Sequence, residues 1–102
     1  MANYRPLPDG LTIKKSKIHN LGLFATKDFK ENINIGITHI VDSETEEVIR
    51  TPLGGFINHS EEPNSRLVHL ARKSYLILNR NIKSGEEITL KYTMYDPTIT
   101  NT

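Results

Sequence analysis

The sequence predicts a mostly-β fold built from small sheets. Apolar and polar residues alternate in short runs, and turn-forming residues separate these runs. No stretch of about twelve or more residues shows the 3.6-residue apolar period of an amphipathic helix. The 102 residues fit one domain, so we take 1–102 as a single domain with a short tail at each end.

The first half of the chain contains three expected strands and one expected helical turn. Leu11–Lys15 alternates and follows a Pro-Asp-Gly turn signal at residues 8–10. Ile33–Val41 alternates almost strictly, which places its isoleucines on one face of a strand. Glu47–Arg50 is a shorter candidate. Thr51–Asn58 is predicted to hold at most one helical turn.

The second half contains an expected hairpin and a final strand. Arg66–Leu70 and Ser74–Leu78 are predicted to pair around a turn at residues 71–73. Glu87–Tyr92 alternates again after a Ser-Gly turn at residues 84–85. Short strands joined by tight turns throughout the chain indicate small sheets, not one large sheet.

Composition and charge exclude several classes of protein. Hydrophobic residues make up 36% of the chain and charged residues 25%, and the net charge is +1. No strong field draws the chain toward nucleic acid or membrane, so we expect no direct nucleic-acid binding. The chain has no cysteine, which excludes disulfides and a thiol nucleophile. No apolar run reaches the ~20 residues of a membrane span. We therefore expect a soluble intracellular protein, cytoplasmic or nuclear.

Several common site types are also unsupported. The sequence has neither a GxxxxGK[ST] loop nor a GxGxxG loop for phosphate binding. Its four histidines have no close acidic or histidine partner at metal-ligand spacing, so we expect no metal. Ser60 and His59 are adjacent, and adjacent side chains on an extended chain point to opposite faces. A hydrolytic serine–histidine pair is therefore not expected.

Three separated stretches carry the chemistry that remains. Residues 16–25 read SKIHNLGLFA, residues 56–64 read FINHSEEPN, and residues 82–92 read IKSGEEITLKY. In this order they resemble the three motifs of SET domains, which are G-x-G-[LV]-F-A, F-x-N-H-S-x-x-P-N and I-x-x-G-E-E-[LI]-T-x-x-Y. The resemblance lies within residues 11–95.

This resemblance implies a fold and an activity. SET domains have the β-clip fold of small sheets, with a pseudoknot-like crossing in which the carboxyl-terminal segment threads under an earlier loop. The family transfers a methyl group from S-adenosyl-L-methionine to an amine. The resemblance therefore implies a methyltransferase that acts on a protein lysine, with a histone-like substrate.

The family motifs imply cofactor-binding roles for five residues. The backbone of Leu21 and Gly22 would lie along the cofactor, and Asn20 stands where the family often has the first glycine. The Asn58 side chain would take the amino-acid end of the cofactor. His59, largely through its backbone, would hold the adenine.

Two tyrosines and a phenylalanine complete the implied site. Tyr92 would be the catalytic tyrosine beside the transferred methyl group and would also contact the cofactor. Phe56 and Tyr95 would form the wall of the substrate channel. Any of these residues alone has an ordinary structural explanation, so the interpretation depends on the order of all three motifs.

The sequence departs from the family in ways that leave the substrate open. Leu21 replaces a commonly aromatic residue, and the segment between Asp42 and Gly54 is shorter than is usual. No cysteine-rich segment follows Tyr92. A second copy of the chain would then complete the channel in a homodimer, or an open site would suit a small amine such as a polyamine. A non-catalytic module that binds the cofactor or a partner is a further alternative.

Overall fold

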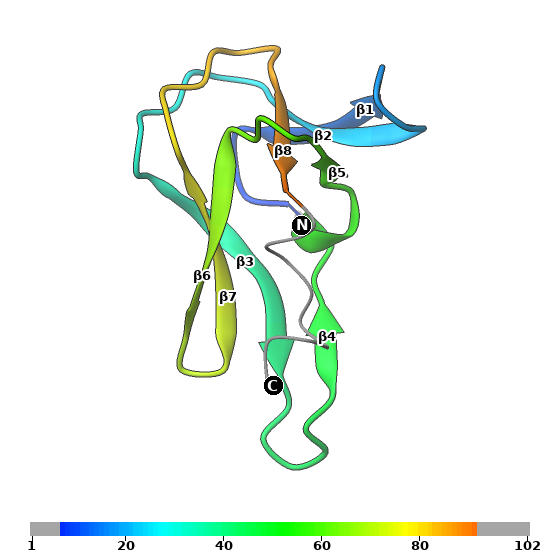
Figure 1. The fold of residues 1–102 in the computed structure, drawn as a ribbon, viewed down its shortest axis with the longest axis vertical. Coiled ribbons are helices and arrows are strands. Elements are labelled where there is room, and N and C mark those ends of the chain that lie inside the picture. Colours follow the sequence, from blue (N-terminus) through cyan, green and yellow to red (C-terminus); the bar gives the residue numbers. More distant parts are fainter. Residues whose placement is uncertain (1–6, 92–102) are drawn as a thin grey trace, which may run out of the picture.

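The computed structural model describes residues 7–91, and Tyr92 and Tyr95 lie outside this range. Within it the chain forms eight strands and one short 3₁₀ helix, as the mostly-β prediction requires (Figure 1). The strands form two four-stranded sheets.

The first sheet joins segments from both ends of the described chain. Its strands, in spatial order, are β1 (Leu11–Lys15), β2 (Leu21–Ala25), β8 (Glu87–Leu90) and β5 (Asn58–His59). β8 runs antiparallel to β2 and parallel to β5. Two motifs that are far apart in the sequence therefore become neighbours of β8.

The second sheet is antiparallel. Its strands, in spatial order, are β4 (Val48–Arg50), β3 (Asn34–Val41), β7 (Lys73–Leu78) and β6 (Ser65–Leu70). The predicted hairpin is confirmed, with a two-residue turn at Ala71 and Arg72. Both residues have positive φ, at 53° and 66°, as the tight turn between twisted strands requires. The 3₁₀ helix η1 (Leu53–Gly55) confirms the single helical turn.

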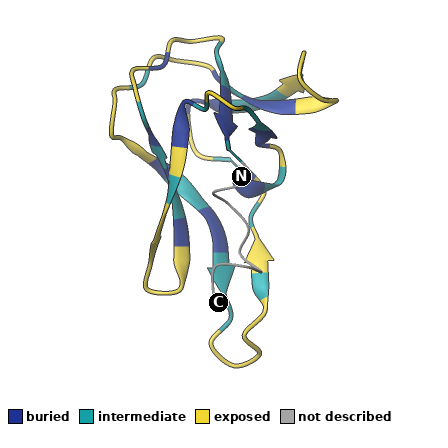
Figure 2. Ribbon diagram, viewed as in Figure 1, coloured by how far each residue is buried: buried dark blue, intermediate teal, exposed yellow. Residues whose placement is uncertain are grey.

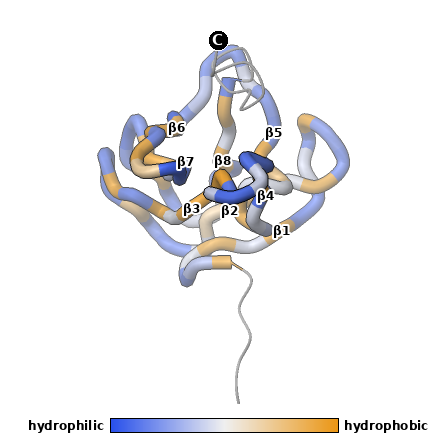
Figure 3. The backbone as a smooth tube through the Cα atoms, turned by 90° about the horizontal axis from the view of Figure 1, so that it is seen from below, coloured by the Kyte–Doolittle hydropathy of each residue, from blue (hydrophilic) through white to orange (hydrophobic). Residues whose placement is uncertain are grey.

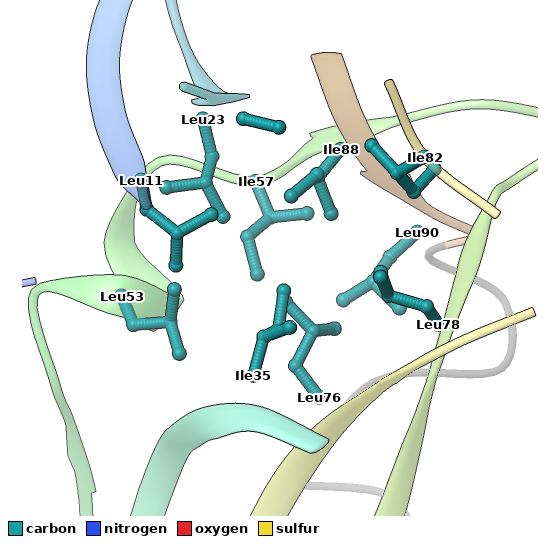
Figure 4. Packing of buried hydrophobic residues seen from close by; sticks show 11 residues of the cluster. Leu11, Leu23, Ile35, Leu53, Ile57, Leu76, Leu78, Ile82, Ile88 and Leu90 are labelled. Atoms are coloured by element: carbon teal, nitrogen blue, oxygen red, sulfur yellow. The ribbon is translucent and has the colours of Figure 1, made fainter. Parts of the chain in front are cut away.

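The core lies between the two sheets. Its leucines and isoleucines come from both of them and from the loops between, as Figure 4 shows. Figure 2 shows buried positions in strands of both sheets, whereas the turns are mostly exposed. In the view from below, β8 lies near the middle, with β6 and β7 on one side and β5 on the other (Figure 3).

The connection from β5 to β6 crosses β8, and hydrogen bonds hold the crossing (Figure 1). The Ser60 N–H donates to the Leu90 carbonyl at 2.8 Å. The Ser65 hydroxyl donates to the Thr89 carbonyl at 2.6 Å. β8 thus passes under an earlier loop, as the SET-like fold leads us to expect.

Two strands were not predicted from the sequence, and three expected strands are shorter: β3 and β4 each begin one residue late, and β8 differs more. β2 and β5 are absent from the sequence-based prediction. Glu87–Tyr92 was expected as one strand, but β8 ends at Leu90. No helix in residues 7–91 is long and apolar enough to cross a membrane.

Candidate functional site

A cavity of about 350 Å³ lies where the turn after β1 meets the segment that links η1 to β5. Its wall is formed by His19, Asn20, Leu21, Gly55, Phe56, Ile57 and Asn58. Four of the residues proposed from the motifs, Asn20, Leu21, Phe56 and Asn58, therefore share one cavity. More than thirty positions of sequence separate the first pair from the second.

Asn58 is held in place by its strand pairing and by three hydrogen bonds from its side chain. It is 7% exposed, and β5 fixes its backbone by pairing it with Thr89 of β8. Its Nδ2 lies 3.1 Å from the carbonyl oxygens of both His19 and Leu21, and 2.8 Å from Oε2 of Glu87. An amide oxygen in that position would face three acceptors, so the orientation of the amide is fixed.

The other end of the same amide is free to bind a ligand. Among residues 7–91, no hydrogen bond uses Oδ1 of Asn58, and no buried polar side-chain atom lacks a partner. Oδ1 is therefore an accessible acceptor on the wall of the cavity. An acceptor in this position can bind an N–H donor such as an ammonium group.

Gly22 accommodates a neighbouring side chain, and the contact of its backbone with the cofactor stays a prediction. It is buried, and a Cβ on it would overlap the Glu87 carboxylate and lie 3.1 Å from Nδ2 of Asn58. Its missing side chain therefore makes room for Glu87. Gly22 is not one of the residues that line the cavity, although its neighbour Leu21 is.

Glu87 is a site residue that the motif analysis missed as an individual side chain. Its carboxylate accepts from the Ser16 hydroxyl at 2.8 and 2.9 Å and from Asn58. Its only sequence signal was its place as the second glutamate of the Gly-Glu-Glu motif.

His59 is half-buried and lies outside the wall of the cavity. Its Nε2 is 2.7 Å from Oε2 of Glu61. The hydrogen bond from His59 and the charge of Lys91 hold the pKa of Glu61 below its usual value. Because the imidazole faces Glu61, the expected adenine contact falls to the backbone of His59.

Tyr92 and Tyr95 lie outside the described residues, which end at Lys91. In residues 7–91, no group of three or more histidine, aspartate or glutamate side chains could hold a metal ion.

A second hollow of about 430 Å³ contains none of the expected site residues. It lies between residues 28–30 and 80–86. Its Glu86 carboxylate pairs with Arg80 at 3.0 Å, so this part of its charged lining is neutralised within the chain. The motifs therefore favour the cavity at Asn58 as the candidate functional site.

The comparison with known families agrees with the resemblance of the three motifs to SET domains. The SET domain model matches residues 40–93, which is more than half of the chain. The chain belongs to the SET-domain family. The matched residues of this SET domain include Phe56, Asn58, His59 and Tyr92, whereas Asn20–Gly22 and Tyr95 lie outside the match.

Solved structures share the fold of this SET domain. A Plasmodium falciparum protein described as a histone methyltransferase has a TM-score of 0.68 at 24% identity, over 81% of this chain and 92% of the other. The methyltransferase domain of human PR domain-containing protein 2 has a TM-score of 0.66 at 17% identity, over 81% of this chain and 76% of the other. No curated protein matches this SET domain in sequence.

The side chains of the cavity fit the methyl donor used by SET methyltransferases. S-adenosylmethionine combines an ammonium group, a positive sulfur and a flat adenine. Oδ1 of Asn58 offers an acceptor, with the Glu87 carboxylate on the far side of the same amide. Leu21 is 45% exposed and offers apolar surface to the donor, and Phe56, at 39% exposed, offers apolar surface to a substrate. The space beside Gly55 is open, since a Cβ there would meet nothing closer than 4.0 Å.

Proposed function

We propose that this SET domain is an S-adenosylmethionine-dependent methyltransferase that acts on lysine side chains of a protein substrate. Family membership supports a methyltransferase, and the words "histone methyltransferase" in the description of one structural neighbour favour a histone-like substrate. The observation that carries the proposal is the orientation of Asn58, whose amide presents Oδ1 from the wall of a cavity built from two SET motifs.

Each residue of the site has a defined part in the proposal. Asn58 would bind the ammonium end of the donor, Leu21 would cover its apolar parts, and Phe56 would form part of the wall of the substrate channel. When bound, the donor supplies a methyl group on a positively charged sulfur. Tyr92 would orient the incoming nitrogen and accept weak C–H···O contacts from the methyl group through its hydroxyl oxygen.

The acceptor must lose a proton before transfer. A lysine with a pKa of ~10.4 is almost entirely protonated at pH 7, and its deprotonation there costs about 4–5 kcal/mol. A nearby positive charge and an apolar channel both disfavour the ammonium form. The chain would therefore help to remove the proton without a strong base. Alignment of donor and acceptor can lower the barrier by as much as about 7–11 kcal/mol.

A methyl-transfer assay tests the proposal. The protein is incubated with isotope-labelled S-adenosylmethionine and, in parallel, with mixed histones, with polyamines, or alone. Label on histone lysine supports the proposal. Label on polyamines alone would show that the substrate is a small amine and not a protein lysine. Cofactor-induced thermal stabilisation without any transfer supports the non-catalytic binding module.

The proposal also includes a homodimer in which a second copy completes the substrate channel. The short segment between Asp42 and Gly54 motivates it, because this segment is usually longer in the family. Light scattering on the active protein, together with activity measured against protein concentration, tests it. A fully active monomer at all concentrations would remove the homodimer from the proposal.

A further inference from the structure

Glu87 lies at the centre of a hydrogen-bond network behind the cavity. The Ser16 hydroxyl donates to its carboxylate, and the same hydroxyl oxygen accepts from the backbone N–H groups of Ile18 at 2.9 Å and His19 at 3.4 Å. Asn58 then donates both to Glu87 and to carbonyls of the same turn. The network starts and ends in residues 16–21, so one carboxylate joins this turn to β5 and β8.

Gly22 makes this position of the carboxylate possible. Any side chain at residue 22 would occupy the space of the Glu87 oxygens. Gly22 has no positive φ, so backbone conformation does not require a glycine here. Close approach of a carboxylate is thus a sufficient physical reason for this glycine.

The position of Glu87 has two consequences for a ligand. Its bond to Nδ2 fixes the Asn58 amide with Oδ1 turned away from Glu87, and Asn58 is part of the wall of the cavity. A charge-assisted bond at one end of an amide also polarises the amide and strengthens its oxygen as an acceptor. The negative charge additionally attracts a cation bound on the other side of the amide.

We propose that Glu87 is a positioning residue that makes the cavity selective for ligands with an α-ammonium group. The proposal rests on the proposed function, because it assumes that the cavity binds the methyl donor. Glu87 acts through Asn58 and through its charge, without contact with the transferred methyl group.

Two ligands separate this role from a general contribution to the fold. S-adenosylhomocysteine carries the ammonium group, and 5′-methylthioadenosine has the same nucleoside and a thioether without the amino-acid end. Calorimetry gives the affinity of both for the wild-type protein, for Glu87→Gln and for the control Glu86→Gln. Glu86 is a suitable control because it pairs with Arg80 outside the cavity.

We expect Glu87→Gln to lower the affinity for S-adenosylhomocysteine by about tenfold or more, because one charge-assisted interaction is lost. We expect Glu87→Gln to change the affinity for 5′-methylthioadenosine by no more than about twofold. Glu86→Gln should change the affinity for neither ligand. An equal loss for both ligands, or no loss for either, overturns the proposal. If the wild-type protein binds neither ligand, the proposed function itself fails.

Ser16→Ala provides a second variant in case Glu87→Gln folds poorly. It keeps the charge but releases the carboxylate from its hydroxyl donor. A smaller loss of affinity, confined to S-adenosylhomocysteine, is expected. Unchanged affinity for that ligand in Ser16→Ala would contradict the positioning role.

Discussion

Oδ1 of Asn64 accepts a hydrogen bond from the backbone N–H of Thr89 at 2.9 Å, although 25 positions of sequence separate them. Nδ2 of the same amide donates to the Glu87 carbonyl at 2.8 Å. One side chain therefore binds both the N–H and the C=O of β8, as a neighbouring strand would. Asn64 thus fixes the β5–β6 connection over the strand that carries Glu87.

Replacement of Asn64 by alanine is expected to destabilise the protein. Asn64 is 5% exposed, so the freed groups of β8 would stay buried without partners. We expect the free energy of unfolding to fall by about 2–4 kcal/mol. Urea unfolding, monitored by circular dichroism, measures this change in the free energy of unfolding. The control Asn81→Ala removes an exposed asparagine with one side-chain bond and should cost under about 1 kcal/mol. Equal effects of the two substitutions would show that the crossing does not depend on Asn64.

Alternation in the sequence was enough to predict the strands with one exposed and one buried face. Leu11–Lys15 is confirmed to the residue, and the hairpin of β6 and β7 to within one residue at the start of each strand. β2 was missed because it lies between β1 and β8, and its Gly22, Leu23 and Ala25 are all buried. Such a strand has no polar face to produce an alternating pattern.

Contacts that are distant in sequence could not be predicted. β5 has only two residues, both polar, and it exists because β8 pairs with it. Leu21, Phe56 and Asn58 line one cavity, whereas the motifs implied cofactor contact for Leu21 and Asn58 and substrate contact for Phe56. The Ser16–Glu87 contact spans 71 positions and depends on the final arrangement of β1, β2 and β8. Only the folded chain shows why the glutamate is there.

The two adjacent glycines of η1 are expected to respond differently to alanine. A Cβ on Gly54 would lie 2.5 Å from the backbone oxygen of Thr38, so β3 or η1 must move. We expect Gly54→Ala to lower the free energy of unfolding by about 1–3 kcal/mol. A Cβ on Gly55 meets only Arg50 at 4.0 Å, so Gly55→Ala should stay within about 0.5 kcal/mol. Thermal or urea unfolding of both variants measures the difference, and a stable Gly54→Ala protein would contradict the packing of η1 on β3.

His39 is expected to make stability depend on pH. It is 3% exposed, and burial, with added contributions from the charge of Arg50 and from His69, lowers its pKa from 6.5 to about 4. Between these values the unfolded chain binds the proton more strongly, so stability rises with pH. The contribution of neutral His39 to the free energy of unfolding is complete above pH 6.5. As the pH falls toward 4, this free energy decreases by up to about 3 kcal/mol.

Unfolding free energies at several pH values between 4.5 and 7 test this effect. His39→Gln should flatten the dependence in this window, whereas replacement of the exposed His19 by glutamine should retain it. Glu61 and Glu86 have pKa values below their usual range, so their contributions are lost at lower pH than this window. An unchanged slope in His39→Gln would assign the dependence to another group.

The assignment of Tyr92 is tested by its conversion to phenylalanine. This change keeps the aromatic ring and removes the hydroxyl oxygen that would accept C–H···O contacts, each worth about 0.5–1 kcal/mol. We expect Tyr92→Phe to fold, to bind S-adenosylhomocysteine normally, and to transfer methyl groups about tenfold more slowly or worse. Single-turnover transfer with labelled donor measures the rate, and a thermal shift with the product checks binding. Tyr75→Phe, on β7 and outside the cavity, is the matched control and should retain full activity. Normal turnover by Tyr92→Phe would move the catalytic role to another residue of the domain.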